Sequence, residues 1–132
     1  MITNPKFAVV HVADQQRALE FFSGPLGFEV RTDAPYGEGA RWLEVCPPGA
    51  QTYLVLAAAD AELAELIRQR RGPMSAVWFE ADDVDATCAE LAARGVVFPV
   101  EPQPAPWDPG GATRWAQFAD PDGNLSGVSS GP

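Results

Sequence analysis

The feature that most constrains the fold of this chain is an internal repeat of the pattern strand, helix, strand, strand, strand. Residues 5–58 and 74–130 each begin with a short apolar run, continue with an amphipathic helical stretch and end with three further strand-like runs. An alanine-rich segment, residues 59–73, joins them as a helical linker. A repeated unit of this size cannot bury its sheet face alone, so each copy must close against another surface. The repeat therefore predicts two modules in tandem within a single domain, residues 1–132.

The helices of the two copies carry matching start and stop signals. Asp14 is a good N-cap for the first helix and Asp82, followed by a second aspartate, begins the second. Glycine ends both helical patterns, and the spacing from Asp14 to Gly27 (27 − 14 = 13) equals that from Asp82 to Gly95 (95 − 82 = 13). The equal spacing supports a repeat of one structural unit.

The strands that follow each helix are interrupted by turn-forming residues. Residues 28–32 alternate like a strand and precede a turn-rich loop at residues 34–39. In the second copy, residues 96–100 form the corresponding strand. A loop containing Pro99, Pro102, Pro104, Pro106 and Pro109 is predicted after it, because proline donates no backbone hydrogen bond.

Charge and composition exclude several classes of function. Acidic residues outnumber basic ones by 18 to 9, for a net charge of −9, which would repel a nucleic acid backbone and attract cationic small molecules. No signal peptide and no apolar run approaching the ~18 residues of a membrane helix is visible. The two cysteines, Cys46 and Cys88, are too few for a disulfide framework. These observations predict a cytoplasmic protein without nucleic acid or membrane partners.

Several motifs together resemble the vicinal oxygen chelate superfamily, the group of glyoxalase I, bleomycin-resistance proteins and extradiol dioxygenases. The first copy carries Leu26-Gly27-Phe28 after its helix, and the second carries the turn 120–124, with sequence DPDGN. The resemblance implies an α+β fold of two βαβββ modules whose sheets curl into open half-barrels. It also implies a ligand cavity in each half-barrel and completion of the barrels in a homodimer.

The resemblance further identifies the positions at which metal-dependent members carry His or Glu. In this chain these positions hold Phe7, Tyr53, Ala76 (or Ser75 if the register slips by one) and Gly127. Such side chains cannot assemble the three or four His, Cys or carboxylate ligands of a transition metal site. We therefore expect no metal and no cofactor, and no glyoxalase or dioxygenase chemistry.

Strand alternation assigns one set of side chains to the predicted cavity. Flat aromatic walls suit a flat aromatic guest, and carboxylates beside them can hold a cationic group. Loop aromatics would serve as lids over the cavity. The predicted ligand-binding residues are Phe7, His11, Trp42, Glu44, Tyr53, Trp78, Glu80 and Trp115, with Tyr36 and Trp107 as the lids.

Two functions follow from this cavity. The first is a binding protein that sequesters an aromatic natural product or antibiotic, neutral or cationic, as bleomycin-resistance-like members do, with no catalytic residue. The alternative is a metal-free enzyme, an isomerase, cyclase or lyase of natural-product biosynthesis, in which His11 acts as acid or base. The sequence favours the binding protein, because His11 has no convincing nucleophile near it.

Overall fold

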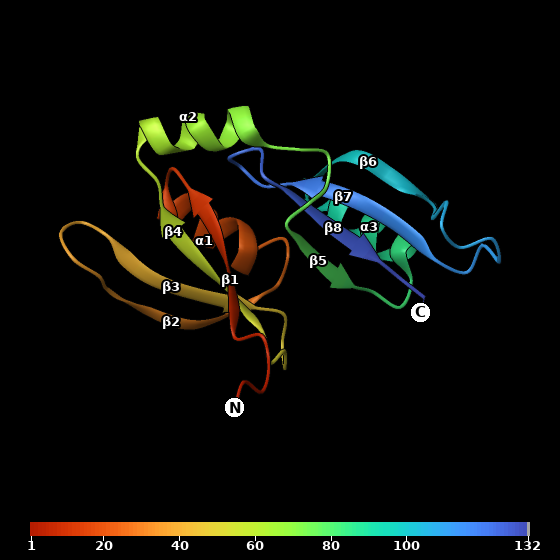
Figure 1. Ribbon diagram of the computed structural model, residues 1–132, viewed down its shortest axis with the longest axis horizontal. Coiled ribbons are helices and arrows are strands. Elements are labelled where there is room, and N and C mark those ends of the chain that lie inside the picture. The colour runs from red at the N-terminus through yellow and green to blue at the C-terminus, as the bar shows by residue number, and fades with distance from the viewer. Residues whose placement is uncertain (132) are drawn as a thin grey trace. The chain divides into compact units, whose positions relative to one another are not determined.

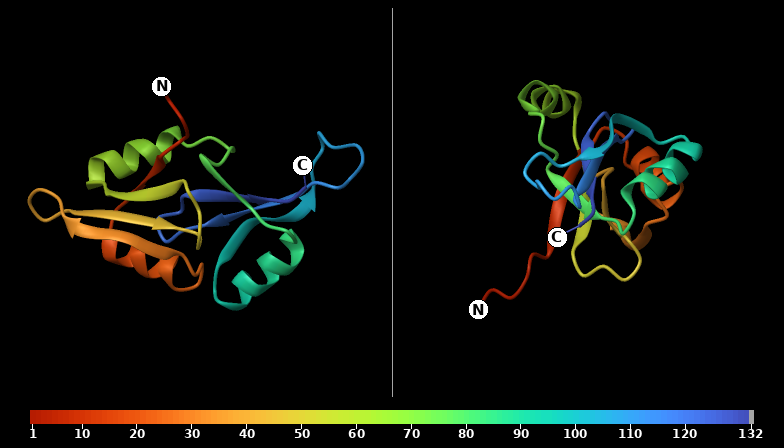
Figure 2. Two further views of the ribbon diagram at one scale, coloured as in Figure 1. Left: turned by 90° about the horizontal axis from the view of Figure 1, so that it is seen from below. Right: turned by 90° about the vertical axis from the view of Figure 1, so that its right-hand side faces the viewer.

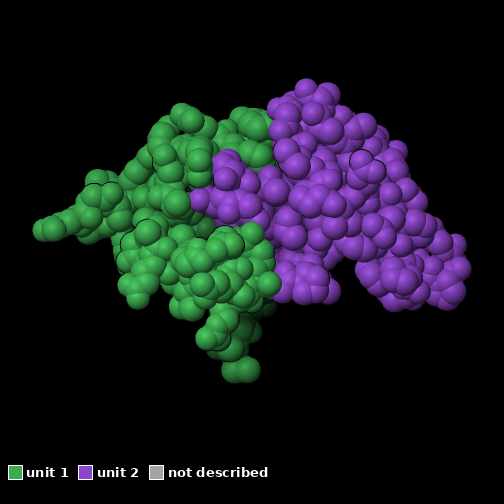
Figure 3. Space-filling model, turned by 90° about the horizontal axis from the view of Figure 1, so that it is seen from above, with its two compact units in different colours: residues 1–71 green, residues 72–132 purple. Residues whose placement is uncertain are grey.

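The computed structural model describes residues 1–131 and divides into two compact units, Met1–Arg71 and Gly72–Pro132 (Figure 3). Each unit contains one four-stranded sheet of mixed parallel and antiparallel pairs, and within the described residues neither sheet closes into a barrel (Figure 1). The two sheets and three helices confirm the predicted α+β fold of tandem modules. That the two units form a single domain stays a prediction.

The first unit follows the predicted order and adds the linker helix. Its sheet has the strand order β1-β4-β3-β2, in which β1 runs parallel to β4 and the other pairs are antiparallel. Helix α1 covers one face of this sheet, and its buried side chains pack with those of the strands. The elements are β1 (Phe7–Val12), α1 (Gln15–Ser23), β2 (Glu29–Pro35), β3 (Arg41–Cys46), β4 (Tyr53–Ala58) and α2 (Ala61–Arg70). The buried core includes Val12, Ala18, Phe22, Leu43, Val45 and Leu56.

The second unit repeats the same topology. Its strand order is β5-β8-β7-β6, again with one parallel pair, β5 with β8. Helix α3 lies against one face of this sheet (Figure 2, left). The elements are β5 (Val77–Glu80), α3 (Val84–Ala93), β6 (Val97–Pro104), β7 (Arg114–Ala119) and β8 (Leu125–Ser129). The buried core includes Val84, Cys88, Ala116, Phe118 and Val128.

Aspartate side chains cap all three helices. Each carboxylate accepts a hydrogen bond from the backbone N–H three residues later, at 3.0 Å for Asp14, 2.8 Å for Asp60 and 2.9 Å for Asp83. These bonds pair donors that the helix itself leaves unpaired. The cap of α3 is Asp83, the second residue of the predicted Asp82-Asp83 pair, so the distance from the cap to Gly95 is 12 positions (95 − 83) and the equality of spacing counted from Asp82 was wrong by one.

Strands β2 and β6 are longer than the sequence predicts. Strand β2 continues to Pro35, and β6 continues through Pro99 and Pro102 to Pro104, where a loop was expected. Both are edge strands of their sheets, and a proline is tolerated there when its missing N–H faces away from the neighbouring strand. Each of the two register shifts of β6 contains one of these prolines, which shows how the ladder accommodates them.

Helix α2 is stabilised mainly by its own sequence. Its alanine, leucine, glutamate and arginine residues have high helix propensity, and charge is distributed as the helix dipole favours, with Glu62 in the first turn and Arg68 in the last. None of its side chains is buried. Among residues 1–131, no helix combines the length and apolarity needed to span a membrane.

Candidate functional site

Burial alternates along the strands that were predicted to line a cavity. In β1, Phe7, Val9 and His11 are exposed, whereas the residues between them are more buried. In β3, Trp42 and Glu44 are half-buried, whereas Leu43 and Val45 are fully buried in the core. Because successive strand side chains point to opposite faces, each sheet has one face packed on its helix and a second face with a distinct set of side chains.

Four aromatic rings gather on the second face of the first sheet, and we call them the first aromatic cluster. Phe7 and Tyr53, paired across β1 and β4, stack with centroids 5.5 Å apart and an interplanar angle of 23°. The ring of Trp42 meets Phe7 edge-on, with centroids 6.0 Å apart, and lies tilted at 42° to Tyr36, with centroids 5.3 Å apart. Phe7 is 38% exposed and Tyr36 is 59% exposed, so the cluster has aromatic surface open to a ligand.

Glu44 is fixed beside this cluster by two hydrogen bonds. The indole Nε1 of Trp42 donates to one carboxylate oxygen at 2.8 Å, and the hydroxyl of Thr32 donates to the other at 2.9 Å. Partial burial raises the pKa of Glu44, but these two bonds and the charge of Arg31 outweigh it, so the pKa lies below its ordinary value. Glu44 is therefore a positioned negative charge at neutral pH.

The first aromatic cluster already contains a cation of the chain itself. The guanidinium carbon of Arg31 lies 4.1 Å from the centroid of the Tyr53 ring. Such a contact is a cation–π interaction. A cationic group of a ligand would therefore compete with Arg31 at Tyr53, whereas Trp42 and Tyr36 offer ring surface next to Glu44.

In the second unit, Trp78 and Trp115 form an indole pair with centroids 6.0 Å apart and an interplanar angle of 55°. Trp78 is the register partner of Gly127. A Cβ atom placed on Gly127 would lie 2.2 Å from the nearest ring atom of Trp78, so only glycine leaves room for the indole. The strand pairing thus places Trp78, and not Ala76, opposite Gly127.

Polar groups around the indole pair are mostly engaged within the unit. Trp78 Nε1 donates to the backbone oxygen of Ser75 at 3.0 Å. The buried amide of Gln117 donates to the hydroxyl of Ser75 at 2.9 Å and to the backbone oxygen of Pro73 at 3.1 Å. In contrast, Trp115 Nε1 is buried and has no acceptor among the described residues.

The structure thus brings the predicted residues together in two sets, one in each unit. The remaining three, His11, Glu80 and Trp107, are exposed, and Trp107 lies in the loop between β6 and β7 with 64% of its surface accessible. A lid role for Tyr36 or Trp107 and a cavity shared by both sets stay predictions. Sequence reasoning missed Thr32, because its position opposite Glu44 follows from the register of β2 and β3, which shifts between Val30 and Thr32.

The residues at the family's metal positions do not fit a metal ion. Phe7 and Tyr53 are stacked on each other, and Gly127 lies under the ring of Trp78. Within residues 1–131, no group of three or more His, Cys, Asp or Glu residues is close enough to share an ion. A phenylalanine ring and a glycine supply no donor atoms for a divalent metal, and the single phenol of Tyr53 cannot assemble a coordination shell. The absence of a metal requirement stays a prediction.

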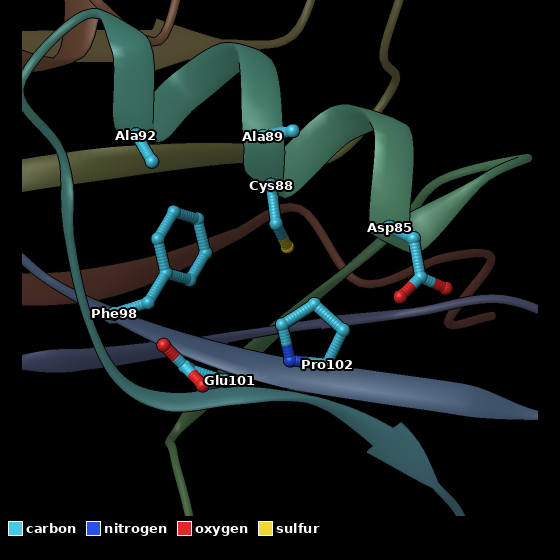
Figure 4. A pocket seen from close by; sticks show the side chains of 7 residues that line it. All are labelled: Asp85, Cys88, Ala89, Ala92, Phe98, Glu101 and Pro102. Atoms are coloured by element: carbon cyan, nitrogen blue, oxygen red, sulfur yellow. The ribbon is translucent and has the colours of Figure 1, made fainter.

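A separate groove of about 300 Å³ lies between α3 and β6 (Figure 4). Its walls are Asp85, Cys88, Ala89, Ala92, Phe98, Glu101 and Pro102, and none of the predicted site residues is among them. Burial, and secondarily the charge of Asp85, raises the pKa of the Cys88 thiol. Asp85 itself is paired with Arg114, which lowers the pKa of that carboxylate. The groove therefore presents a neutral thiol and not a reactive thiolate.

Comparison with known proteins adds three findings. The family model of the Glyoxalase/Bleomycin resistance protein/Dioxygenase superfamily matches residues 6–127. The uncharacterized protein YetH of Bacillus subtilis (strain 168) is 33% identical over 125 residues, which are 95% of this chain and 96% of YetH. The crystal structure of TnmS3, an antibiotic binding protein from Streptomyces sp. CB03234, is 36% identical with a TM-score of 0.78, covering 99% of this chain and 98% of TnmS3.

Proposed function

Because this chain belongs to the glyoxalase/bleomycin resistance protein/dioxygenase superfamily, as its motifs predict, we propose that it binds and sequesters an aromatic natural product or antibiotic. The observation that carries the proposal is the aromatic surface on the sheet faces of both units, described above. The similarity to TnmS3, an antibiotic binding protein, supports a ligand-binding role for this chain.

The chemistry of the sheet faces favours a flat, aromatic ligand. Aromatic pairs add about 0.5–1.5 kcal/mol beyond the burial of their surface, and a ring buries roughly 150–250 Å². The exposed parts of Phe7 and Tyr36 and the half-buried indole pair offer such contacts. Stacking on two rings would therefore supply much of the affinity without any covalent step.

We propose that this binding requires neither metal nor cofactor. The family's metal positions hold stacked rings and a glycine, which offer hydrophobic contact in place of coordination. Glu44 adds a fixed negative charge, and the chain as a whole has a net charge of −9. Both features favour a neutral or cationic ligand over an anionic one.

The alternative of a metal-free enzyme with His11 as the acid or base stays a prediction. Glu44, the carboxylate next to the first aromatic cluster, is held as an anion by two hydrogen bonds. A carboxylate that exchanges protons near neutral pH needs a raised pKa, and that of Glu44 is lowered. Glu44 therefore suits a fixed charge for binding better than a proton-transfer group.

We further propose a homodimer in a reducing, cytoplasmic setting. Apolar side chains of the first unit, Phe7, Val9 and Val30, are 38%, 45% and 44% exposed, which favours an additional covering surface. Cys46 and Cys88 are both free and buried. Sedimentation at micromolar concentration should give a species of about twice the 14.1 kDa chain mass, and a clean monomer would contradict the dimer.

The proposed function is tested by titrating the intrinsic tryptophan fluorescence with polycyclic and glycopeptide antibiotics. We expect saturable quenching. In Trp78→Ala the binding free energy should be weaker by about 2 kcal/mol or more, as is usual when a central aromatic contact is truncated. Leu66→Ala, which shortens an exposed apolar side chain of α2, is the control and should bind like the parent. If Trp78→Ala binds every compound as tightly as the parent, the indole pair is not part of the site.

A further inference from the structure

Three of the indole N–H groups differ in their hydrogen-bond acceptors. Trp42 Nε1 donates to the Glu44 carboxylate at 2.8 Å, and Trp78 Nε1 donates to the backbone oxygen of Ser75 at 3.0 Å. Trp115 Nε1 is also buried, but no acceptor among residues 1–131 lies within hydrogen-bonding distance of it. Buried donors without a partner are rare in folded proteins and costly, so this one requires an explanation.

The position of Trp115 points to a ligand. Trp115 lies in β7, an inner strand of the second sheet, and its ring contacts Trp78 on the face that carries the proposed site. Its side chain is only half-buried, so part of the ring is accessible although the Nε1 atom is covered. Gln117, the neighbouring polar side chain on this face, donates its amide N–H groups within the unit and does not accept a hydrogen bond from Trp115 Nε1.

We propose that Trp115 is a specificity-determining residue whose N–H donates to an oxygen acceptor of the bound molecule. The ligand class is thereby narrowed to aromatic ring systems that carry a carbonyl or a similar oxygen on the ring. This inference rests on the proposed function, since it assigns one contact within the same site. A molecule that stacks on the indole pair without an acceptor leaves the donor unpaired and loses affinity.

The hydrogen bond to the ligand assigns different roles to the two indoles. Because the Nε1 atom is covered, donation to a ligand requires the Trp115 ring to turn until its N–H reaches an acceptor at the edge of a molecule stacked on Trp78. The N–H of Trp78 cannot take this role without breaking its bond to Ser75. Trp78 therefore supplies stacking surface, and Trp115 supplies stacking surface together with the hydrogen bond.

The test compares two probes that differ by one carbonyl group, an aminomethyl fluorenone and the matching aminomethyl fluorene. Their amino group carries a positive charge, which suits a chain of net charge −9. The parent protein should bind the fluorenone about 5-fold more tightly, in the range of one net hydrogen bond. Trp115→Phe should abolish this preference. Trp78→Phe is the matched control and should keep it, because the N–H lost there donates to Ser75.

A second measurement does not depend on the stability of a variant. In the ¹⁵N-labelled parent protein, the indole N–H resonance of Trp115 should move downfield when the fluorenone is added and stay near its position with the fluorene. Equal affinity for both probes in the parent protein would overturn the inference and leave the proposed function standing. If Trp78→Phe lost the preference for the fluorenone as completely as Trp115→Phe, the preference would come from stacking and not from the Trp115 N–H, which would also overturn the inference. Failure of both probes to bind would count against the proposed function itself.

Discussion

The two units share one topology but present different chemistry on their sheet faces. Both sheets pair the first strand of the module with its last strand in parallel and place the second strand at the opposite edge. The first unit combines tyrosine, phenylalanine and one indole with the fixed charges of Glu44 and Arg31. The second combines two indoles with amides and a glycine. The repeated scaffold therefore fixes where the side chains lie, whereas the residue types at those positions determine which ligand chemistry each face can bind.

The turns before the last strand of each module also differ in the groups that hold them together. In the first unit a proline–proline–glycine turn is closed by one backbone bond, from Ala50 N to Pro47 O at 3.0 Å. In the second, the buried carboxylate of Asp120 accepts hydrogen bonds from Asp122 N at 2.9 Å and from Asn124 N at 2.8 Å. Burial raises the pKa of Asp120 even though these bonds oppose the shift. Backbone bonds also close this turn, from Asp120 N to Asn124 O and from Gly123 N to Asp120 O, both at 2.9 Å, so the Asp120 side chain is an additional support that the first turn lacks.

Removing that side chain should have the largest effect on stability. Asp120→Ala leaves the backbone N–H groups of Asp122 and Asn124 without this acceptor, and we expect a loss of about 3 kcal/mol in the free energy of unfolding, measured with urea. Asp120→Asn keeps one acceptor oxygen and should lose less. The comparison of turns would fail if Asp120→Ala were no less stable than Ala50→Ser, a change in the turn of the first unit.

The glycine under the indole gives the next largest effect. Gly127→Ala places a methyl group 2.2 Å from Trp78, so the ring must move, and we expect a loss of about 1–3 kcal/mol in unfolding free energy. Thermal and urea denaturation would measure it. In a Trp78→Ala background the same substitution should cost much less, because the ring is gone. Equal costs in both backgrounds would show that Trp78 does not restrict this position.

Removing the negative charge of Glu44 in the first unit should have a smaller effect on stability, and this effect should depend on pH. Glu44→Gln weakens one of two hydrogen bonds and should cost about 1 kcal/mol at neutral pH. Since the pKa of Glu44 is lowered by folding, its contribution is complete above its ordinary value of 4.5 and is lost as the pH falls through the lower folded value. Urea unfolding at several pH values should therefore show parent and variant converging in acid. Glu38→Gln, at an exposed loop carboxylate, should show no such pattern.

The smallest expected effect concerns the two cysteines. Burial raises the pKa of both Cys46 and Cys88, so both should react slowly with a thiol reagent in the folded protein. Cys88 borders the groove between α3 and β6 and should react a few times faster than Cys46. Single Cys→Ala variants allow the two rates to be assigned by mass spectrometry. Faster labelling of Cys46 would mean that the groove gives a reagent no access.

Local signals predicted most of the fold. Asp14 before a helical stretch and the alternation of β3 are properties of a few neighbouring residues, and both were confirmed. The extent of β6 was not predicted, because proline is excluded from an inner strand but tolerated at an edge, and edge position depends on the whole sheet. The choice of Asp83 over Asp82 as the cap depends equally on the final backbone geometry.

The candidate site was predictable only in part. Strand alternation, combined with the metal positions that the family resemblance identifies, assigned Phe7, Trp42 and Tyr53 to one face, and the structure places the ring of Phe7 in contact with the other two. The hydrogen bond from Thr32 to Glu44 and the unpaired N–H of Trp115 depend on strand register and side-chain orientation. A single sequence reveals neither the register nor the orientation, because the residues that pair are distant along the chain.

We propose that the chain binds an aromatic small molecule on its sheet faces and returns it unchanged. The most direct measurement is equilibrium dialysis against polycyclic and glycopeptide antibiotics, with and without EDTA, followed by mass spectrometric recovery of the bound compound. We expect saturable binding of at least one compound, unaltered by EDTA, with the compound recovered intact. Binding that EDTA abolishes, or recovery of a modified product whose formation requires His11, would contradict the account.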